Sequence, residues 1–271
     1  MLKKFKEYKK QQDQFENIII LPNNRYRKGE GGLRIKSSLK NNIKIKPLIT
    51  VITVVFNESK KLEETILSVI GQSYKNIEYI IIDGGSTDDT LKVIHKYENL
   101  IDYWVSEKDN GIYDAMNKGC KLSMGRGLIF LNAGDKFVGD VFHNKQKPPF
   151  LLPCKVIDEE GKIFEKKISD VKIGIPTSHQ AMVFFNKSIL YDLRYEISSD
   201  YDYFIRHGVF LNLDKSCPGY VLYDNNGISK NNNWKRDFET VIILYRHFGF
   251  LKSLKFIKQQ LIKLIYKKII K

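Results

Sequence analysis

Polar side chains that could do chemistry stand just after several stretches that are predicted to be buried strands. These residues are Asn57, Glu58, Asp83, Asp109 and Asp135. In an open parallel sheet, ligands bind outside the carboxyl ends of the strands, so the five side chains should converge on one crevice. Several carboxylates at one edge repel each other unless a cation joins them. The pattern therefore favours a divalent metal that carries a phosphorylated ligand.

Two common phosphate-binding signatures are missing from the sequence. No Gly-x-x-x-x-Gly-Lys-Ser/Thr motif occurs, and no Gly-x-Gly-x-x-Gly motif follows the first predicted strand. These absences argue against a P-loop NTPase and against a simple dinucleotide-dependent dehydrogenase.

The elements that must position the polar residues alternate between strand and helix. The run 48–55 is β-branched and continuously apolar, which is typical of a strand buried on both faces. Further strands are predicted at 77–82, 103–105 and 128–131, and helices at 62–70, 91–97 and 112–122. Ser86 and Asp89 have the spacing of a capping pair that opens the second helix. The alternation predicts a mostly parallel α/β sheet with helices on both faces.

The second half of the chain is less regular. Prolines indicate loops and an added β-hairpin within 140–175, and a helix that begins with carboxylates is predicted at 198–208. From residue 229 onward the pattern is helical.

Charge divides the 271 residues into three parts. Residues 1–46 hold 13 Lys and Arg against 4 Asp and Glu, and residues 228–271 hold 11 against 2. Residues 47–227 hold 21 against 25, so a slightly acidic body carries a basic extension at each end. We expect a loosely structured arm over 1–46, one catalytic domain over 47–227 and a helical segment over 228–271.

Targeting signals and cysteines indicate the compartment. The N-terminus lacks the apolar region of a signal peptide, and no run reaches the 18 apolar residues of a membrane span. The three cysteines, Cys120, Cys154 and Cys217, are odd in number and far apart, which argues against a disulfide framework or a zinc site. We therefore expect a reducing, cytoplasmic location.

Several blocks of sequence together resemble a known enzyme family. Residues 48–58 and 80–88 are similar to the opening of an inverting glycosyltransferase of family 2, which has the Rossmann-like GT-A fold of nucleotide-diphospho-sugar transferases. Residues 104–119 resemble the branch that builds bacterial surface polysaccharides, such as colanic acid, O-antigen and capsule. The resemblance extends over roughly 47–227.

The resemblance implies which residues bind the donor nucleotide. They are Phe56, Asn57, Glu58, Asp83, Gly85, Asp114 and Lys118. Asp83 would accept a hydrogen bond from the base, most simply the uracil imide, while Asp114 and Lys118 would lie near the sugar and diphosphate. The residues alone leave other interpretations open, because Asp83 could cap a turn and the segment 114–118 could be a solvated helix face.

The same resemblance implies a metal site. Asp135 matches the last carboxylate of the family's metal-binding motif, where it would hold Mn²⁺ or Mg²⁺ against the diphosphate. Asn132 and Gly134 occupy two places that are usually acidic, and fewer carboxylates weaken the binding of a hard cation. Gly84 likewise stands where many relatives carry a second Asp.

The catalytic base is expected in the second half of the chain. Residues 198–206 resemble the family's acidic motif at the start of a helix, which aligns Asp200 with the carboxylate that deprotonates the acceptor hydroxyl and leaves Asp202 as the alternate. His179 matches a block on the acceptor side. Without the resemblance, Asp200 could be a helix N-terminal charge favoured by the dipole, and His179 could be structural.

The last 21 residues have the pattern of a basic amphipathic helix. One side carries Lys252, Lys255, Lys263, Lys267 and Lys271, and the other carries Leu254, Ile257, Leu261, Leu264, Ile265 and Ile269. Such helices lie in anionic membrane surfaces, although docking of the apolar side on the catalytic body is the alternative.

These features predict a hexosyltransferase at the inner face of the cell membrane. It would move a sugar from a nucleotide sugar, expected to be UDP-linked, to a lipid-linked glycan acceptor. A catalytically lapsed or nucleotidyltransferase-type relative shares the fold and is the first alternative. A nucleic-acid-binding protein is a weaker one, because the C-terminal Lys residues alternate with Ile and Leu and the body is acidic, so no nucleic-acid partner is expected.

Overall fold

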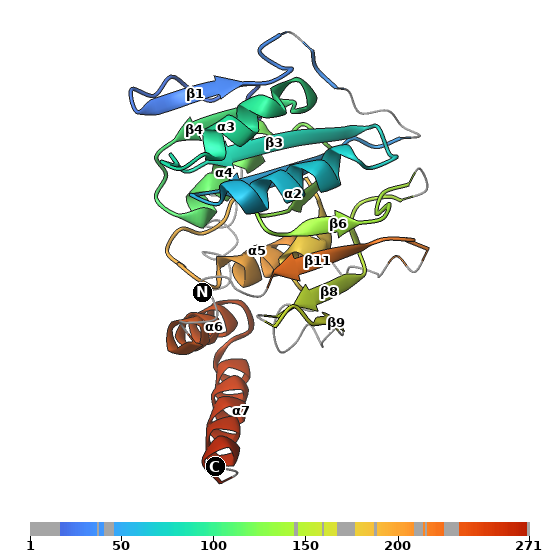
Figure 1. The fold of residues 1–271 in the computed structure, drawn as a ribbon. Helices are drawn as coiled ribbons and strands as arrows, with labels where there is room; N and C mark the ends of the chain where they lie inside the picture. The colour runs from blue at the N-terminus through green and yellow to red at the C-terminus, as the bar shows by residue number, and fades with distance from the viewer. Residues whose placement is uncertain are drawn as a thin grey trace.

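The computed structural model describes residues 17–36, 38–40, 46–143, 146–158, 160–166, 177–186, 189–208, 214, 216–224 and 233–269, with the side chains of 233 and 263–269 excepted. Two sheets and the helices packed on them form the body, with the first of two C-terminal helices against it and the second extending away (Figure 1). We therefore expect any site built by the sheets to lie within this body.

The larger sheet has seven strands, four of which run parallel in the centre. In spatial order the strands are β1 (Arg27–Gly31), β4 (Tyr103–Glu107), β3 (Ile77–Asp83), β2 (Ile49–Val55), β5 (Gly127–Phe130), β10 (Met182–Phe185) and β7 (Phe150–Leu151). Strands β1 and β10 pair antiparallel with their neighbours β4 and β5. The prediction of a mostly parallel sheet is confirmed.

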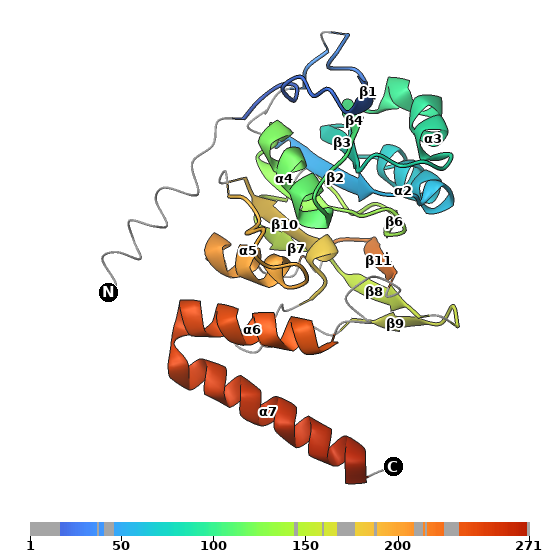
Figure 2. The same ribbon diagram turned by 90° about the vertical axis from the view of Figure 1, so that its left-hand side faces the viewer.

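Helices cover both faces of this sheet, as the apolar strands predicted (Figure 2). They are α2 (Ser59–Ile70) and α3 (Thr90–Lys96) on one face, and α4 (Ile112–Leu122) and α5 (Ser199–His207) on the other. In β2, Ile52 packs in the same buried cluster as Met116 of α4, whereas Val51 packs in the cluster that holds Leu62 of α2. Every residue of β2 and β3 is buried for this reason.

The smaller sheet lies beside the larger one. Its strands, in spatial order, are β6 (Lys136–Val138), β11 (Tyr220–Asp224), β8 (Cys154–Ile157) and β9 (Ile163–Glu165). The antiparallel pair β8–β9 is the added hairpin predicted within 140–175. Two 3-10 turns, η1 (Glu98–Leu100) and η2 (His179–Ala181), complete the body.

The capping pair predicted for α3 is wrong. Asp89 precedes the helix but makes no capping hydrogen bond with its side chain, and the Ser86 hydroxyl instead donates to the carboxylate of Asp83. Asp88 takes the capping role, because its carboxylate accepts the backbone N–H of Thr90 at 3.0 Å.

Part of the segment expected to be a loose arm belongs to the sheet. Residues 27–31 form the edge strand β1. Arg34 is buried and forms an ion pair of 2.6 Å with Glu78 of β3. The expectation is therefore wrong for these residues, while 1–16, 37 and 41–45 lie outside the described part of the chain.

The C-terminal segment is helical, as predicted. Helix α6 (Asn233–Phe248) packs on α5, and α7 (Phe250–Ile269) folds back at Gly249 to pack on α6 (Figure 2). Gly249 has φ of +82°, a conformation that glycine adopts without strain. Among the described residues, no helix is both long and apolar enough to cross a membrane.

Candidate active site

A cavity of about 840 Å³ lies at the carboxyl ends of β2 and β5. Its walls also include the start of α4, the turn η2, the start of α5, the end of β11 and the first part of α6. This is the edge at which an open parallel sheet binds its ligands, as the sequence predicted. Glu58, Asp109 and Asp135 of the predicted set line it.

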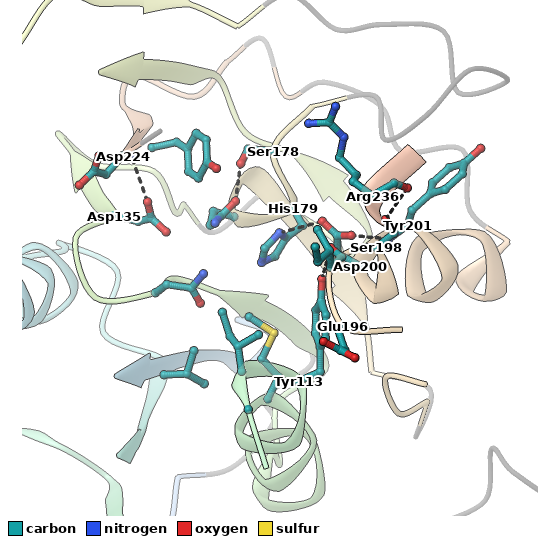
Figure 3. Close-up of a pocket in the computed structure, with 18 of the residues that line it drawn as sticks. Tyr113, Asp135, Ser178, His179, Glu196, Ser198, Asp200, Tyr201, Asp224 and Arg236 are labelled. Atoms are coloured by element: carbon teal, nitrogen blue, oxygen red, sulfur yellow. Dashed lines mark hydrogen bonds and ion pairs between the residues drawn. The ribbon is translucent and has the colours of Figure 1, made fainter. Parts of the chain in front are cut away.

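Carboxylates stand on opposite sides of this cavity. Asp135 and Asp224 lie on one side, and His179 and Asp200 lie on the other (Figure 3). The space between the two groups is where a substrate could contact both.

Asp135 is nearly inaccessible to solvent and is hydrogen-bonded to the end of strand β11. Its carboxylate accepts the backbone N–H of Asp224 at 3.0 Å. Burial, together with the negative charge of Asp224, raises the pKa of Asp135 to about 7. Asp224 forms an ion pair of 3.3 Å with Lys61, so this side of the cavity combines two carboxylates with one lysine.

The residues around Asp135 suit a hard divalent cation. The Oδ1 atom of Asn132 is buried without a hydrogen-bond partner among the described residues, and both Asn132 and Asp135 line the cavity. Carboxylate and amide oxygens are the ligands that Mg²⁺ and Mn²⁺ prefer. No cluster of three or more His, Cys, Asp or Glu with metal-site geometry occurs among the described residues, so the donor set is a thin one.

Asp200 lies in the first turn of α5 and faces the cavity. His179 approaches it, with 3.5 Å between Nδ1 of the imidazole and Oδ2 of the carboxylate. The other ring nitrogen, Nε2, is buried and has no hydrogen-bond partner among the described residues. The two residues that the sequence assigned to the acceptor side thus lie together.

Asp202, the alternate candidate for the base, forms ion pairs outside the cavity. Its carboxylate is buried between Arg206 at 2.6 Å and His247 of α6 at 2.7 Å, and it does not line the cavity. Burial alone would raise its pKa, but the hydrogen bond from His247 and the charge of Arg206 outweigh burial and lower it. Of the two residues expected as candidates for the base, Asp200 lines the cavity and Asp202 does not.

Two of the predicted nucleotide-binding residues hold loops together. Asp83 is fully buried, and its oxygens accept hydrogen bonds from Ser86 and from Ser106, the latter at 2.5 Å. Asn57 has φ of +53°, and its side-chain oxygen accepts the backbone N–H of Thr87 at 2.7 Å. Neither residue lines the cavity, so their contact with a nucleotide stays a prediction.

Three more of that set also lie away from the cavity wall. The Asp114 carboxylate accepts the backbone N–H of Asn110 at 3.0 Å, and Lys118 forms an ion pair of 2.9 Å with Glu107. Gly85 has φ of +87° in the loop after β3. Phe56 and Glu58, in contrast, do line the cavity.

Asp109 takes the place that a side chain at position 84 would need. A Cβ atom on Gly84 would lie 2.6 Å from Oδ2 of Asp109, so glycine here lets that carboxylate approach the strand end. Asp109 lines the cavity, and burial raises its pKa.

Some lining residues were not expected from the sequence. Asp224, Lys61, Lys166 and Arg236 belong to segments that carry no motif, and they reach the cavity through tertiary packing. Lys166 forms no ion pair with a described residue, and burial lowers its pKa.

Comparison with protein families finds a match for the part of the chain that contributes the cavity residues from Phe56 to Asp135. Residues 50–147 match the family described as Glycosyl transferase family 2. Residues 50–147 therefore correspond to a family 2 glycosyltransferase domain. The resemblance to family 2 found in the sequence is thereby confirmed for these residues, which extend from β2 to β6 and include Asp135.

Three curated relatives of this glycosyltransferase domain share parts of the chain. An uncharacterized glycosyltransferase of Mycobacterium tuberculosis is 45% identical over 94 residues, which are 34% of this chain and 36% of that protein. A PGL/p-HBAD biosynthesis glycosyltransferase of Mycobacterium bovis is 29% identical over 189 residues, 59% of this chain and 69% of that protein. TuaG of Bacillus subtilis, whose name provisionally assigns it to teichuronic acid biosynthesis, is 37% identical over 98 residues, 35% of this chain and 39% of that protein.

Solved structures share the fold. S. aureus TarS, residues 1–349 in complex with UDP-GlcNAc, has a TM-score of 0.55 at 14% identity and covers 77% of this chain and 71% of that one. The mannosyltransferase PcManGT of Pyrobaculum calidifontis, in complex with GDP-Man and Mn²⁺, has a TM-score of 0.52 at 15% identity and covers 80% and 68%. The glycosyltransferase domain therefore has the GT-A fold.

Proposed function

We propose that this protein is an inverting glycosyltransferase that moves a sugar from a UDP-linked donor to a hydroxyl of a lipid-linked glycan during bacterial surface polysaccharide synthesis. The observation that carries the proposal is the pair of carboxylates, Asp135 and Asp200, on opposite sides of one cavity at the carboxyl edge of the sheet. The names of two relatives, which refer to teichuronic acid and to PGL biosynthesis, support a role in cell-surface glycan assembly.

The geometry suits direct displacement at the anomeric carbon. Asp200 would accept the proton of the acceptor hydroxyl as that oxygen attacks, and attack from the face opposite the leaving nucleotide inverts the configuration. A nucleoside diphosphate leaves without a general acid. His179 would orient the Asp200 carboxylate from 3.5 Å.

The opposite side of the cavity would hold the diphosphate. Asp135 and Asn132 would bind a divalent cation, which when bound supplies positive charge against the leaving group. Lys61 places a second positive charge on the same side through its ion pair with Asp224. Because few carboxylates are available to bind the cation, we expect the protein to bind Mn²⁺ or Mg²⁺ more weakly than a site with several carboxylate ligands does.

Calorimetric titration with UDP and GDP, each with and without Mn²⁺, tests the proposal. We expect UDP to bind more tightly than GDP and Mn²⁺ to strengthen UDP binding. In Asp135→Asn, which keeps the shape but removes the charge, Mn²⁺ should no longer strengthen binding. Binding of neither nucleotide would contradict the donor assignment and favour the lapsed relative.

The same titration should depend on pH. A raised carboxyl pKa of about 7 means that Asp135 is protonated below neutral pH and charged above it. Because the cation requires the carboxylate, the Mn²⁺-dependent gain in UDP affinity should increase from pH 6 to pH 8, and the Asn variant should show no such increase.

Helices α6 and α7 support the proposal that the protein docks on the inner face of the cell membrane from the cytoplasm. They expose ten large apolar side chains, which are Trp234, Phe238, Tyr245, Phe248, Phe250, Leu251, Leu254, Ile257, Leu261 and Ile262. Exposed Lys252, Lys255 and Lys258 lie on the same segment of α7. Aromatic and aliphatic side chains beside lysines suit an anionic lipid interface, where a lipid-linked acceptor is found.

Sedimentation with vesicles tests the membrane proposal. Reversing the charge of Lys252, Lys255 and Lys258 to Glu should weaken binding to phosphatidylglycerol vesicles by roughly 100-fold or more, because each lysine contributes about 1 kcal/mol near an anionic surface. Deletion of 251–271 should release the protein from the vesicles. UDP binding should persist in the charge-reversal variant, because none of its three lysines lines the cavity. If the protein without residues 251–271 stayed on the vesicles, the proposal that α7 binds the membrane would be contradicted.

A further inference from the structure

A carboxylate from helix α6 holds the segment that leads into the helix of the base. Glu239 is only 5% exposed, and its two oxygens accept the backbone N–H groups of Glu196 at 2.9 Å, Ile197 at 3.0 Å and Ser198 at 2.8 Å. Ser198 immediately precedes α5, and Asp200 lies in the first turn of that helix. One side chain of α6 therefore fixes three consecutive peptide groups just before the base.

This contact is stronger than an ordinary loop contact. Hydrogen bonds to an ionised acceptor are roughly twice as strong as neutral ones, and all three converge on a single buried carboxylate. Two further bonds hold the same segment, since Tyr113 of α4 donates its hydroxyl to the Ile197 carbonyl at 2.6 Å and the Ser198 hydroxyl donates to the Arg236 carbonyl at 3.2 Å. The backbone leading to Asp200 thus has little freedom while Glu239 is in place.

Helix α6 also contacts the segment on either side of these peptides. Arg246 donates to the Tyr195 hydroxyl at 2.6 Å, and His247 bonds the carboxylate of Asp202 at 2.7 Å. The helix lies outside the 50–147 match to family 2 and after the catalytic domain expected from the sequence. It nevertheless contacts the segment that carries Asp200 through four of its residues, which are Arg236, Glu239, Arg246 and His247.

We infer that Glu239 is a positioning residue for Asp200, and that α6 is therefore a part of the catalytic apparatus. The inference rests on the proposed function, in which Asp200 deprotonates the acceptor. Misplacing a reacting group by about 1 Å can cost on the order of 100-fold in rate. Loss of the three hydrogen bonds frees the start of α5 to shift by such a distance, while Asp135 on the opposite side of the cavity keeps its own contacts.

The first test compares Glu239→Ala with Glu239→Gln in the full-length protein. We expect kcat for transfer to fall by about 100-fold in the Ala variant. The decrease in kcat should be smaller in the Gln variant, because its amide oxygen still accepts hydrogen bonds from backbone N–H groups. The dissociation constant for UDP should stay unchanged in both. Glu64→Ala serves as the control, because Glu64 lies on α2 with an exposed side chain paired to Lys136, and its kcat should equal that of the wild type.

A second test separates positioning from general stability. If Glu239 acts through the base, adding Glu239→Ala to Asp200→Asn should lower the residual rate no further. Hydrogen exchange at the amides of Glu196, Ile197 and Ser198 should accelerate in Glu239→Ala, whereas the strands of the larger sheet keep their protection.

The outcomes distinguish this inference from the function on which it rests. Wild-type kcat in both Glu239 variants, alongside an inactive Asp200→Asn, would overturn the inference and leave the proposed function intact. Parallel losses of UDP affinity, thermal stability and kcat in both Glu239 variants would likewise overturn it, since they indicate a purely structural role. Full transfer by Asp200→Asn would contradict the base assignment itself.

Discussion

Replacing Asp200 by Asn is expected to lower the rate of sugar transfer by about 10²- to 10⁴-fold and to leave UDP binding intact. The amide keeps the size and position of the carboxylate at the start of α5 but cannot take a proton from the acceptor hydroxyl. General-base catalysis contributes about 10²- to 10⁴-fold to rate, so a loss in this range is expected. UDP release in the presence of acceptor measures transfer, and calorimetry measures nucleotide affinity.

The matched control for this prediction is Asp202→Asn. Asp202 is bonded to Arg206 and His247 and does not line the cavity. Its replacement should therefore lower the free energy of unfolding, while the rate of transfer falls much less than in Asp200→Asn. Turnover retained by Asp200→Asn but lost in Asp202→Asn would place the base at Asp202 and would show that the first turn of α5 moves when substrates bind.

Replacing Arg34 by Met should destabilise the fold by about 3–5 kcal/mol, because it leaves the buried Glu78 carboxylate without its partner charge. Arg34 and Glu78 have side chains only 1% exposed, at an Nη2 to Oε1 distance of 2.6 Å. The guanidinium also donates to the carbonyls of Ile19 at 3.0 Å and Leu122 at 2.9 Å. One residue of the basic N-terminal segment thus joins an edge loop, β3 and the end of α4.

Urea unfolding followed by circular dichroism measures this effect. Lys36→Met is the control, since Lys36 is exposed and its ammonium group donates to Asn99 on the surface. The free energy of unfolding of this variant should stay within about 0.5 kcal/mol of that of the wild type. If Arg34→Met were as stable as the wild type, the N-terminal segment would contribute nothing to the fold, contrary to its buried ion pair.

Much of the central fold could be predicted because its signals are local. The run 48–55 is apolar without alternation, and only burial on both faces of a sheet accounts for that pattern. Strand β1 gave no such signal, since Arg27, Lys28 and Glu30 with two glycines have low β-propensity. Its pairing with β4, more than 70 residues later, depends on tertiary contacts that a local pattern does not contain.

Some residues of the candidate site could likewise be predicted from local sequence, whereas others reach it only through tertiary packing. Asp135 and Asp200 stand at the ends of regular elements, and the family resemblance singled them out for the metal and for the acceptor; the structure places both on one cavity. Asp224 enters through the pairing of β11 with β6, and Glu239 enters through the docking of α6 on α5. Lys118 looked like a donor-binding residue because it lies in a family block, but its charge is paired with Glu107.

The composition of strand β1 affects whether the sheets of two molecules can pair edge to edge. An unpaired sheet edge is a template for the strand of a second molecule and hence for aggregation. Here Arg27, Lys28 and Glu30 carry charge along the edge strand, and an irregularity between Arg27 and Gly29 breaks its regular register. The opposite edge, β7, is only two residues long. Among the described residues, the larger sheet therefore offers a second molecule no long, flat edge with which to pair its own strands.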